Sequence, residues 1–403
     1  MKNAVIAQSG GPTSAINATL AGVIKGLIEN NCPEIFGALN GIEGILKDNI
    51  ISLNEFKDEE KFKLLCQTPA AYLGSCRVKL KPDDTDAFDT IFSVFEKHNI
   101  GYFFYIGGND SMNTVLRLSE YAKEKNLDVK IMGIPKTIDN DLPVTDHTPG
   151  FGSAAKYIAT TTKQVALDAM VYETNSVTII EIMGRHAGWL TAASILARDE
   201  DISAPHLVYL PEKAFDTEEF LADVKKSVEK YRNVIVCVSE GIKSADGTFI
   251  CEEASSGLFD AFGHKNLSGT GKVLENIVRD KLGYKVRSVE LNVCQRCASH
   301  ILSKTDIEES LEIGRKGAEF AISGETGKMV IVKRESSSPY TYSVDFTSVE
   351  NTANLEKCAP ESWILSSSEL SADAIEYLKP LIEGEVDIIY KNSLPASIIV
   401  NKK

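Results

Sequence analysis

The sequence of 403 residues has little positive charge and no long apolar run. Lys and Arg number 43 against 57 Asp and Glu, which gives a formal net charge of −14. This balance disfavours a nucleic acid as the main partner, because nonspecific nucleic-acid binding depends on a basic surface. No stretch approaches the ~20 apolar residues of a membrane span, and the first apolar stretch, NAVIAQ, runs into glycines rather than into a signal-peptide core. We therefore expect a cytoplasmic protein that acts neither on nucleic acid nor at a membrane.

Cysteine is also scarce, with eight in the chain. Most cysteines lie inside apolar runs, such as Cys237 in VIVCV, which is typical of small buried side chains rather than of a disulfide-stabilised fold. Cys294 and Cys297 form a C-x-x-C motif, but no second cysteine pair or nearby histidine has the spacing of a zinc site. We therefore expect no disulfides and no metal at this motif.

Short apolar strands alternate with amphipathic helices along most of the chain. The first unit is a strand at 3–8, a glycine break and a helix from Ser14 to about Glu29 with apolar residues at helical spacing. The alternation pauses at a connection rich in Asp, Pro and Gly from Thr137 to Gly152, resumes with a helix near 153–169, and becomes weaker after about residue 340. This pattern predicts an α/β fold with two similar three-layer α/β/α domains and mostly parallel sheets.

Glycine-rich and polar motifs follow the predicted strands. Ligands of parallel α/β folds collect at the carboxyl ends of strands, so these motifs hold the candidate functional residues. In chain order they are SGGP (9–12), GGNDS (107–111), PKTIDND (135–141), MGRHAG (183–188), SEG (239–241) and CQR (294–296).

Two glycine pairs, Gly10-Gly11 and Gly107-Gly108, each separate a strand from a helix. Small residues there let a phosphate approach backbone N–H groups and the helix dipole. A bare Gly-Gly turn is equally compatible with a tight connection, and neither segment matches a dinucleotide fingerprint or a P-loop. The polar residues after Gly108 are also natural helix caps.

The segment Thr137–Asp141 carries paired carboxylates beside a basic residue. Asp139 and Asp141 are two residues apart in an extended segment, so they point to the same side, and Lys136 is close by in the sequence. Such a pair can hold a divalent metal while one member removes a proton from a hydroxyl. An Asx-turn linker is the structural alternative.

Several basic groups lie at the ends of elements in this acidic protein. They are Arg77 in LGSCR, Arg185 and His186 in MGRHAG, Arg287 in KVRS and Arg296 in CQR. Singly each arginine is compatible with a surface ion pair, whereas together they suit bidentate phosphate recognition. Glu240, after VIVCV, is placed to accept hydrogen bonds from sugar hydroxyls, or alternatively to cap a helix. The combination favours phosphoryl transfer to a phosphorylated polyol by positioning and charge neutralisation.

Over roughly residues 3–340 the sequence resembles the phosphofructokinase family. SGGP, GSxR, GGNDS, PKTIDND, MGRHAG, SEG and QR occur in the family's order and at plausible spacing. The variant is most similar to the pyrophosphate-dependent branch, because ATP-using members generally carry Gly-Gly-Asp-Gly and Pro-Gly-Thr-Ile-Asp-Asn-Asp at two of these motifs. The resemblance implies a reversible, Mg²⁺-dependent transfer from pyrophosphate to the 1-hydroxyl of fructose 6-phosphate, a step of glycolysis and gluconeogenesis.

Two substitutions relative to the ATP-using motifs have a physical reading. Asp110 stands where a glycine leaves room for the α-phosphate of a nucleotide, so its bulk and charge should oppose nucleotide binding. Lys136 replaces a glycine and adds a positive charge beside the transferred phosphoryl group, which should help a pyrophosphate leaving group that has no adenosine to anchor it.

The family's residue roles can be carried over motif by motif. The resemblance implies that Asp139 is the base for the sugar hydroxyl, with Lys136 and Arg185 assisting catalysis. Donor-binding residues would be Gly11, Arg77, Gly108 and Asp110. Substrate-binding residues would be Thr137, Asp139, Met183, Gly184, Arg185, Glu240, Arg287 and Arg296. Asp110 and Asp141 would hold the metal.

The resemblance also implies a domain arrangement and an oligomer. Residues 1–150 with about 296–340 would bind the donor phosphates, residues 151–295 the sugar phosphate, and residues 341–403 would be an extension packed on the domains, with the active site in the cleft between the domains. Arg287 matches an arginine that reaches a neighbouring subunit's sugar-phosphate site, which implies a homodimer or homotetramer.

Three positions depart from the family's pattern. Asn109 replaces the aspartate usually associated with Mg²⁺, Val293 stands in place of a sugar-binding histidine, and Ser176 replaces a second intersubunit arginine. We therefore expect the metal ligands and the acceptor pocket to differ from those of relatives. Two alternatives stay open: an ATP-dependent 6-phosphofructokinase, and a non-catalytic homologue that binds sugar phosphate and regulates a partner.

Overall fold

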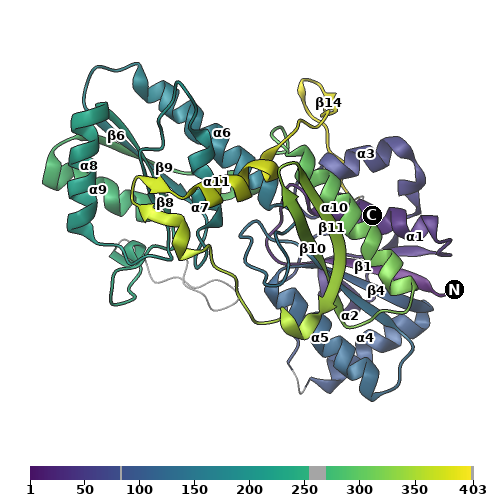
Figure 1. Cartoon of the computed structure of the whole chain (residues 1–403). Coiled ribbons are helices and arrows are strands. Elements are labelled where there is room, and N and C mark those ends of the chain that lie inside the picture. Colours follow the sequence, from purple (N-terminus) through teal and green to yellow (C-terminus); the bar gives the residue numbers. More distant parts are fainter. Residues whose placement is uncertain (82–83, 254–268, 401–403) are drawn as a thin grey trace. The chain divides into compact units, whose positions relative to one another are not determined.

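The computed structural model describes residues 1–81, 84–253 and 269–400 and divides into two compact units (Figure 1). Unit 1 comprises Met1–Ser153, Arg296–Glu356 and Glu383–Lys403, and unit 2 comprises Ala154–Gln295 and Lys357–Ile382. Each unit is α/β with a largely parallel sheet, as the alternation of strands and helices predicts. Residues after 340 are shared between the units.

Unit 1 is built on a seven-stranded sheet with strand order β11-β10-β5-β4-β1-β2-β3. Adjacent strands from β10 to β2 run parallel, and the two edge strands, β3 and β11, pair antiparallel. The strands are β1 (Asn3–Gln8), β2 (Ile35–Ala38), β3 (Ile50–Ser52), β4 (Ile100–Gly107), β5 (Lys130–Pro135), β10 (Lys328–Ser337) and β11 (Tyr340–Ser348). The carboxyl ends of β1, β4 and β5, which are neighbours, therefore carry the SGGP, GGNDS and PKTIDND motifs.

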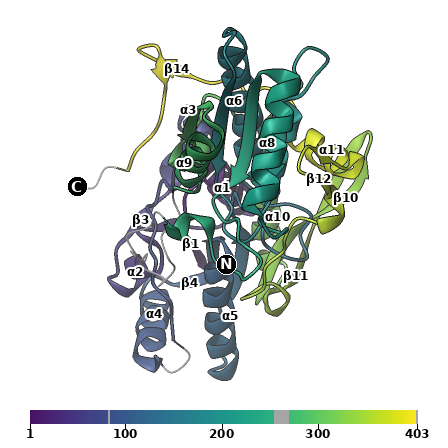
Figure 2. The ribbon, with the colours of Figure 1, turned by 90° about the vertical axis from the view of Figure 1, so that its left-hand side faces the viewer.

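Helices cover both faces of this sheet, because alternate strand residues point into two separate cores. Val5 and Phe103 pack with α2 (Gly41–Leu46), α4 (Thr85–Lys97) and α5 (Asn109–Glu124). Ala4 and Phe104 pack with α1 (Ile16–Glu29), α3 (Glu59–Gln67) and α10 (Lys304–Ile322). Figures 1 and 2 show α4 and α5 together on one side of the sheet.

Unit 2 has a four-stranded parallel sheet with the order β7-β8-β6-β9. Its strands are β6 (Ser176–Ile182), β7 (Leu207–Tyr209), β8 (Asn233–Ser239) and β9 (Lys285–Glu290), and its longer helices are α6 (Phe151–Met170), α8 (Thr217–Tyr231) and α9 (Thr270–Leu282). The helix predicted near 187–198 is shorter and divided, with α7 at Trp189–Ala193 followed by a 3₁₀ turn at Ser194–Ala197.

The residues after β11 form short elements on both units. On unit 1 these are the 3₁₀ turn Val349–Asn351 and the β14 (Tyr390–Lys391) and β15 (Leu394–Pro395) pair. On unit 2 they are the 3₁₀ turn Glu361–Trp363, β12 (Ile364–Ser366), β13 (Glu369–Leu370), α11 (Ala372–Leu378) and the 3₁₀ turn Lys379–Ile382. Gln67 at the end of α3 fixes the β14–β15 segment through hydrogen bonds with Ile389 and Ala396.

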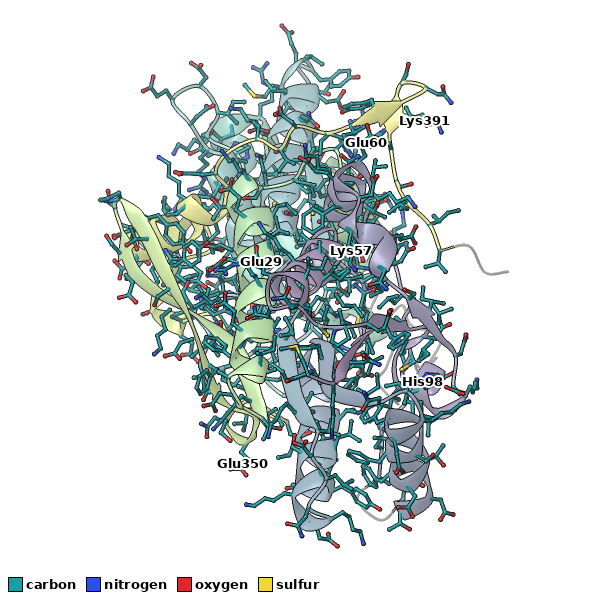
Figure 3. All side chains as sticks on the ribbon, turned by 90° about the vertical axis from the view of Figure 1, so that its right-hand side faces the viewer. Glu29, Lys57, Glu60, His98, Glu350 and Lys391 are labelled. Atoms are coloured by element: carbon teal, nitrogen blue, oxygen red, sulfur yellow. The ribbon has the colours of Figure 1, made fainter. Side chains whose placement is uncertain are left out.

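Charged side chains line the surface of unit 1. Figure 3 shows examples at Glu29, Lys57, Glu60, His98, Glu350 and Lys391. Within the described part of the chain, every helix is too short or too polar to cross a bilayer.

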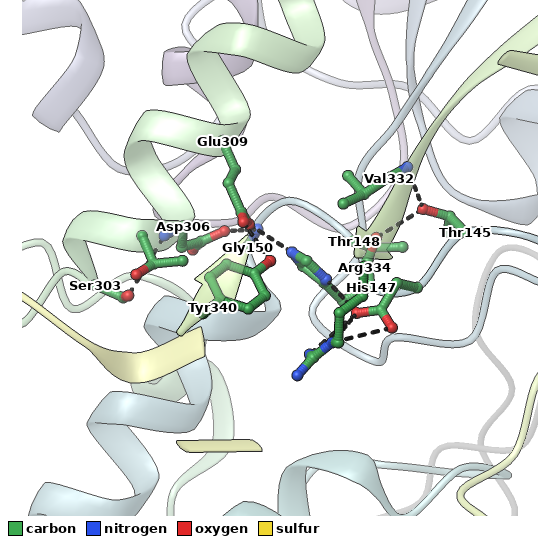
Figure 4. Close-up of polar contacts among 12 residues, drawn as sticks. Thr145, His147, Thr148, Gly150, Ser303, Asp306, Glu309, Val332, Arg334 and Tyr340 are labelled. Atoms are coloured by element: carbon green, nitrogen blue, oxygen red, sulfur yellow. Dashed lines mark hydrogen bonds and ion pairs between the residues drawn. The ribbon is translucent and has the colours of Figure 1, made fainter. Parts of the chain in front are cut away.

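A buried network of charged side chains fixes the connection that follows the PKTIDND motif (Figure 4). His147 is 3 % exposed, and its two ring nitrogens lie 2.8 Å from Asp146 and 2.5 Å from Glu309 on α10. Arg334 on β10 pairs with Asp146 at 3.1 Å, and the Tyr340 hydroxyl donates to Glu309 at 2.5 Å. The connection is thus tied to α10 and to the β10–β11 hairpin.

The charge of His147 contributes to stability in a pH-dependent way. Burial opposes the charged imidazole, but Glu309 and Asp146 outweigh it and raise the pKa of His147 from 6.5 to about 9. Because the pKa is higher in the folded state, this stabilisation is complete below about pH 6.5 and is lost as pH rises through about 9. The difference corresponds to roughly 3 kcal/mol.

We predict that Glu309→Gln removes most of this pH dependence. The free energy of unfolding of the unmodified protein should fall by up to about 3 kcal/mol more than that of the variant between pH 6.5 and pH 10. Denaturant unfolding across this pH range measures the difference. Glu308→Gln, which alters a neighbouring surface ion pair with Lys304, is the control. Parallel pH profiles for the unmodified protein and Glu309→Gln would contradict the assignment.

Candidate active site

Lys136 follows β5 and lies against the glycine turn that follows β1. Its backbone N–H donates to Gly107 at 3.0 Å, and its ammonium donates to the carbonyl oxygen of Gly11 at 2.5 Å. The side chain is 2 % exposed. A Cβ at Gly10 would lie only 3.2 Å from Nζ, and Gly10 has a φ of +75°, so glycine fits this turn for both space and conformation.

Arg296 brings a second cation to the same turn. A Cβ at Gly11 would lie 3.0 Å from a guanidinium nitrogen of Arg296, so both basic groups border the Gly10-Gly11 backbone. Burial lowers the pKa of Lys136, as does Arg296, while Asp139 and Asp141 partly counteract them, and the result is a value of about 8. At neutral pH the turn therefore carries two positive charges, one of them shielded from solvent.

Asp139 and Asp141 lie on the segment that follows Lys136. The Thr137 hydroxyl accepts the N–H of Asp139 at 3.1 Å, and the Thr148 hydroxyl donates to the carbonyl of Thr137 at 2.8 Å. Burial raises the pKa of Asp141 to about 7, with further contributions from the charges of Asp139 and Glu356. Two carboxylates are therefore held near each other in partly buried surroundings.

The carboxylates fit a divalent cation. Oδ1 of Asp141 is buried and has no hydrogen-bond partner among the described residues, which is a position that a cation would satisfy. Carboxylate oxygens are ligands that Mg²⁺ prefers, and Mg²⁺ usually keeps several waters and substrate phosphates as its other ligands. The described part of the chain contains no cluster of three His, Cys, Asp or Glu side chains suited to a metal.

The residues Gly107–Asp110, here called the β4–α5 turn, span the end of β4 and the start of α5. Asp110 in the first turn of α5 forms an ion pair with Lys79 at 2.9 Å, and both side chains are about half exposed. The amide of Asn109 is engaged by backbone groups of Asn354 and Leu355. Asp110 as a metal ligand stays a prediction, since in this structure its carboxylate faces a lysine.

Arg77 follows a segment that contacts the glycine turn. The hydroxyl of Ser75 donates to the carbonyl of Gly10 at 2.7 Å, and the N–H of Gly10 points to the carbonyl of Cys76 at 3.5 Å. The Arg77 side chain is exposed. Unit 1 thus brings Gly11, Lys136 and Arg296 together. Arg77 is the next residue after Cys76, whose carbonyl oxygen lies at the same turn.

Unit 2 carries a second group of predicted residues on the loop Met183–Gly188, here called the β6–α7 loop, after β6. The N–H of Gly184 donates to Glu240 at 3.4 Å, and the N–H of Met183 donates to Gln295 at 3.2 Å. Gly184 has a φ of +141°, and a Cβ there would lie 2.5 Å from a backbone oxygen. Arg185 is half-buried and makes no ion pair with any described residue.

Three further predicted positions lie elsewhere in unit 2. Arg287 is on the edge strand β9, is 47 % exposed and lies 3.7 Å from Asp168. Val293 is also exposed, whereas Ser176 is buried and donates to the side chain of Asn233. Ser176 therefore has a structural role within the sheet, consistent with its departure from the family's arginine.

Sequence reasoning missed the residues that support these loops. His147 and Glu309 hold the connection after Asp141, and Glu212 accepts the N–H of Gly188 at 2.7 Å. Their partners are remote in the sequence and no motif marks them. The only available signal was the presence of a histidine and an aspartate, Asp146-His147, within a long connection.

Comparison with known proteins gives a consistent picture. The phosphofructokinase family model matches residues 3–306. The chain is 40% identical over 400 residues to the pyrophosphate--fructose 6-phosphate 1-phosphotransferase of Halomonas elongata, covering 98% of this chain and 94% of that protein. The Methylococcus capsulatus protein of the same name is 39% identical over 401 residues, covering 98% and 94%.

A solved structure agrees with the sequence comparison. The crystal structure of a pyrophosphate-dependent phosphofructokinase from Nitrosospira multiformis matches with a TM-score of 0.88 and 37% identity, covering 100% of this chain and 98% of that chain. The match therefore includes the residues after 340 as well as the motif-bearing part. This chain belongs to the phosphofructokinase family.

Proposed function

We propose that this protein transfers a phosphoryl group reversibly between pyrophosphate and the 1-hydroxyl of fructose 6-phosphate, producing fructose 1,6-bisphosphate and phosphate. The observation that carries the proposal is the buried Lys136 ammonium at the Gly11 carbonyl, which puts a fixed charge where ATP-using relatives are expected to have a glycine. Relatives that match almost the whole chain carry the pyrophosphate-dependent name. Phosphofructokinases generally use Mg²⁺, and we propose that cofactor here.

The Gly10-Gly11 turn supplies the donor site in this proposal. Glycine leaves the backbone accessible, and Lys136 and Arg296 offer two positive charges to a compact, highly charged ligand. In the transition state negative charge develops on the leaving phosphate, and a preorganised ammonium stabilises it without rearranging. Arg77 extends the basic surface beyond this turn.

The Asp110–Lys79 pair accounts for the choice of donor. A carboxylate at position 110 occupies space that the α-phosphate of a nucleotide would need, and it repels that phosphate. Its pairing with Lys79 holds it in place at the start of α5. Pyrophosphate has no third phosphate and is not affected.

Asp139 acts as the general base. Thr137 fixes the backbone at Asp139, and the neighbouring carboxylate of Asp141 is available for the cation. Asp139 takes the proton of the sugar 1-hydroxyl as the oxygen attacks the phosphoryl group. When bound, Mg²⁺ neutralises charge on the transferring phosphoryl group and the leaving phosphate.

Unit 2 binds the acceptor. Arg185 has no ion-pair partner among the described residues and is available to a sugar phosphate, while Gln295 and Glu240 hold the loop that carries it by accepting the N–H groups of Met183 and Gly184. Glu240 is fixed through its backbone, since its N–H donates to Ile182 and its carbonyl accepts from Thr270. Its carboxylate suits a sugar hydroxyl.

We also propose that a second copy of the chain completes the sugar-phosphate site. The end of α6 and the following turn expose Leu167, Met170, Val171 and Tyr172, with Val171 at 72%. The edge strand β9, which carries Arg287, has no fully buried side chain. Exposed apolar side chains of this size often mark protein interfaces. A homodimer or homotetramer acting in the cytoplasm is therefore part of the proposal.

The first prediction concerns the base. Asp139→Ser should lower kcat by at least about 10²-fold with little change in the affinity for fructose 6-phosphate, because the proton acceptor is lost and the phosphate contacts remain. Steady-state kinetics and calorimetric binding measure the two effects. Asp128→Ser, at an exposed aspartate paired with Lys2, is the control. A near-normal kcat for Asp139→Ser rules out this role.

The second prediction concerns donor choice. Asp110→Gly should admit ATP, though weakly, and Lys136→Gly should impair pyrophosphate turnover mainly in kcat, because the ammonium acts on the leaving phosphate. The double variant should favour ATP most. The measurement is kcat/KM for both donors in all four proteins, with ATP freed of pyrophosphate. If the unmodified protein prefers ATP, the ATP-dependent alternative replaces the proposal; if Asp110→Gly leaves the donor ratio unchanged, the steric account is wrong.

The third prediction concerns the shared site. Arg287→Ala and Asp139→Ser should each be nearly inactive alone, and mixing them under conditions of subunit exchange should restore activity, because hybrids contain one site with both residues intact. Activity of the mixture relative to each parent is the measurement. No recovery despite demonstrated exchange, or full activity of a strictly monomeric protein, would refute a shared site.

A further inference from the structure

The segment Asn354–Ala359, here called the strap, is one of the places where the chain passes between the units, because the second segment of unit 1 ends at Glu356 and the second segment of unit 2 begins at Lys357. At its unit 1 end it is fixed to the β4–α5 turn. The side-chain amide of Asn109 donates to the carbonyl of Leu355 at 2.6 Å, and its oxygen accepts the N–H of Asn354 at 2.6 Å. Both the nitrogen and the oxygen of the Asn109 side-chain amide are thus hydrogen-bonded to the strap.

The unit 2 end of the strap is fixed to the β6–α7 loop. Oε1 of Glu212 accepts the N–H of Gly188 at 2.7 Å and the N–H of Ala359 at 2.8 Å, so one carboxylate oxygen joins the loop to the strap. The indole N–H of Trp189 donates to the carbonyl of Lys357 at 3.0 Å. The Cys358 thiol lies 3.4 Å from the carbonyl of His186.

We propose that the strap couples the two binding loops, and that Asn109 and Glu212 are positioning residues for the donor and for the sugar phosphate. This inference rests on the function proposed above. Neither side chain needs to touch a substrate. Each side chain fixes a segment whose backbone is expected to contact a substrate. When a substrate orders one of these segments, the strap orders the other.

The chemistry of Asn109 supports this role. The contact with the strap needs one donor and one acceptor on the same side chain, which an asparagine amide provides. A carboxylate would still accept the N–H of Asn354 but could not donate to Leu355, and it would place a charge against a carbonyl oxygen. The asparagine that replaces the family's usual aspartate thus has a use of its own at this position.

Glu212 has a similar specialised environment. Burial raises its pKa, and its second oxygen, Oε2, is buried and without a partner among the described residues. A glutamine would keep an acceptor oxygen for both N–H groups, whereas alanine would leave both without this partner. Glu212→Gln is therefore a conservative variant against which Glu212→Ala can be compared.

The strap has a natural spectroscopic reporter. The chain contains two tryptophans, and their rings are in contact, with Trp189 and Trp363 centroids 5.2 Å apart. Trp189 bonds to the strap directly, and the Lys357 ammonium lies 5.0 Å from its ring centroid. Tryptophan fluorescence therefore reports on the unit 2 end of the strap, while Asn109 lies at its unit 1 end.

The first experiment uses no substrate. Asn109→Asp should shift the tryptophan emission to longer wavelength and increase its quenching by acrylamide, because releasing Leu355 loosens the strap at Lys357. Asn351→Asp, an exposed asparagine next to the strap that bonds only to Thr347 among the described residues, should do neither. Unchanged fluorescence in Asn109→Asp would contradict the proposal that the strap couples the two loops, and this result does not depend on the proposed function.

The second experiment measures pyrophosphate and fructose 6-phosphate binding by calorimetry, each alone and with the other present. In the unmodified protein each ligand should raise the affinity for the other by the same factor, since coupling is reciprocal. Asn109→Asp should lower the affinity for pyrophosphate by about fivefold, because one ordinary hydrogen bond is lost. It should also abolish the coupling between the two ligands. Glu212→Ala should lower the affinity for fructose 6-phosphate and abolish the coupling. Glu212→Gln should keep both the affinity and the coupling close to those of the unmodified protein.

The outcomes separate the two proposals. An unmodified protein that binds fructose 6-phosphate and ATP but not pyrophosphate overturns the proposed donor, and the fluorescence result then decides the strap alone. If the protein binds pyrophosphate and the coupling survives in both Asn109→Asp and Glu212→Ala, the coupling role of the strap is wrong. The proposed function is then unaffected.

Discussion

The contact between the Lys136 ammonium and the Gly11 carbonyl is the constraint on which the proposed donor site depends. It joins the ends of two strands, β5 and β1, and it lies against Gly10, where a Cβ would be 3.2 Å from the ammonium nitrogen. A charge in such a position is costly unless it is paired, and Asp139 and Asp141 partly compensate its burial. The lysine, the glycines and the carboxylates therefore form one interdependent group.

The remainder of unit 1 serves to hold this group in place. The parallel order of β5, β4 and β1 brings three motifs to one edge of the sheet, and the network of His147, Glu309 and Arg334 anchors the connection after Asp141. The same network involves α10 and the β10–β11 hairpin, which come from the last third of the chain. Residues that carry no motif thus stabilise the segment that carries the most informative one.

Much of the fold could be predicted from local patterns, and for the candidate site these patterns indicate which motifs follow neighbouring strands. The central strands, the covering helices and the glycine turns are each visible in a short window, because burial on both faces gives continuous apolar runs and phosphate sites need glycine. The edge strand Tyr340–Ser348 was not predicted, since it is only partly buried and has polar residues throughout. The contacts of Asp146 with Arg334 and of Asn109 with Leu355 join residues 188 and 246 apart, and a single sequence has no local signal for such pairs.

The central claim is that the protonated Lys136 binds the donor, and the pH dependence of pyrophosphate affinity tests it most directly. Calorimetric titrations of the unmodified protein and of Lys136→Met from pH 7 to 10 separate the lysine from the titration of pyrophosphate itself. The account predicts a large affinity advantage of the unmodified protein near pH 7, which declines as pH rises past about 8 and the ammonium loses its proton. Equal affinities of the two proteins at pH 7, or an advantage that stays constant to pH 10, would contradict it.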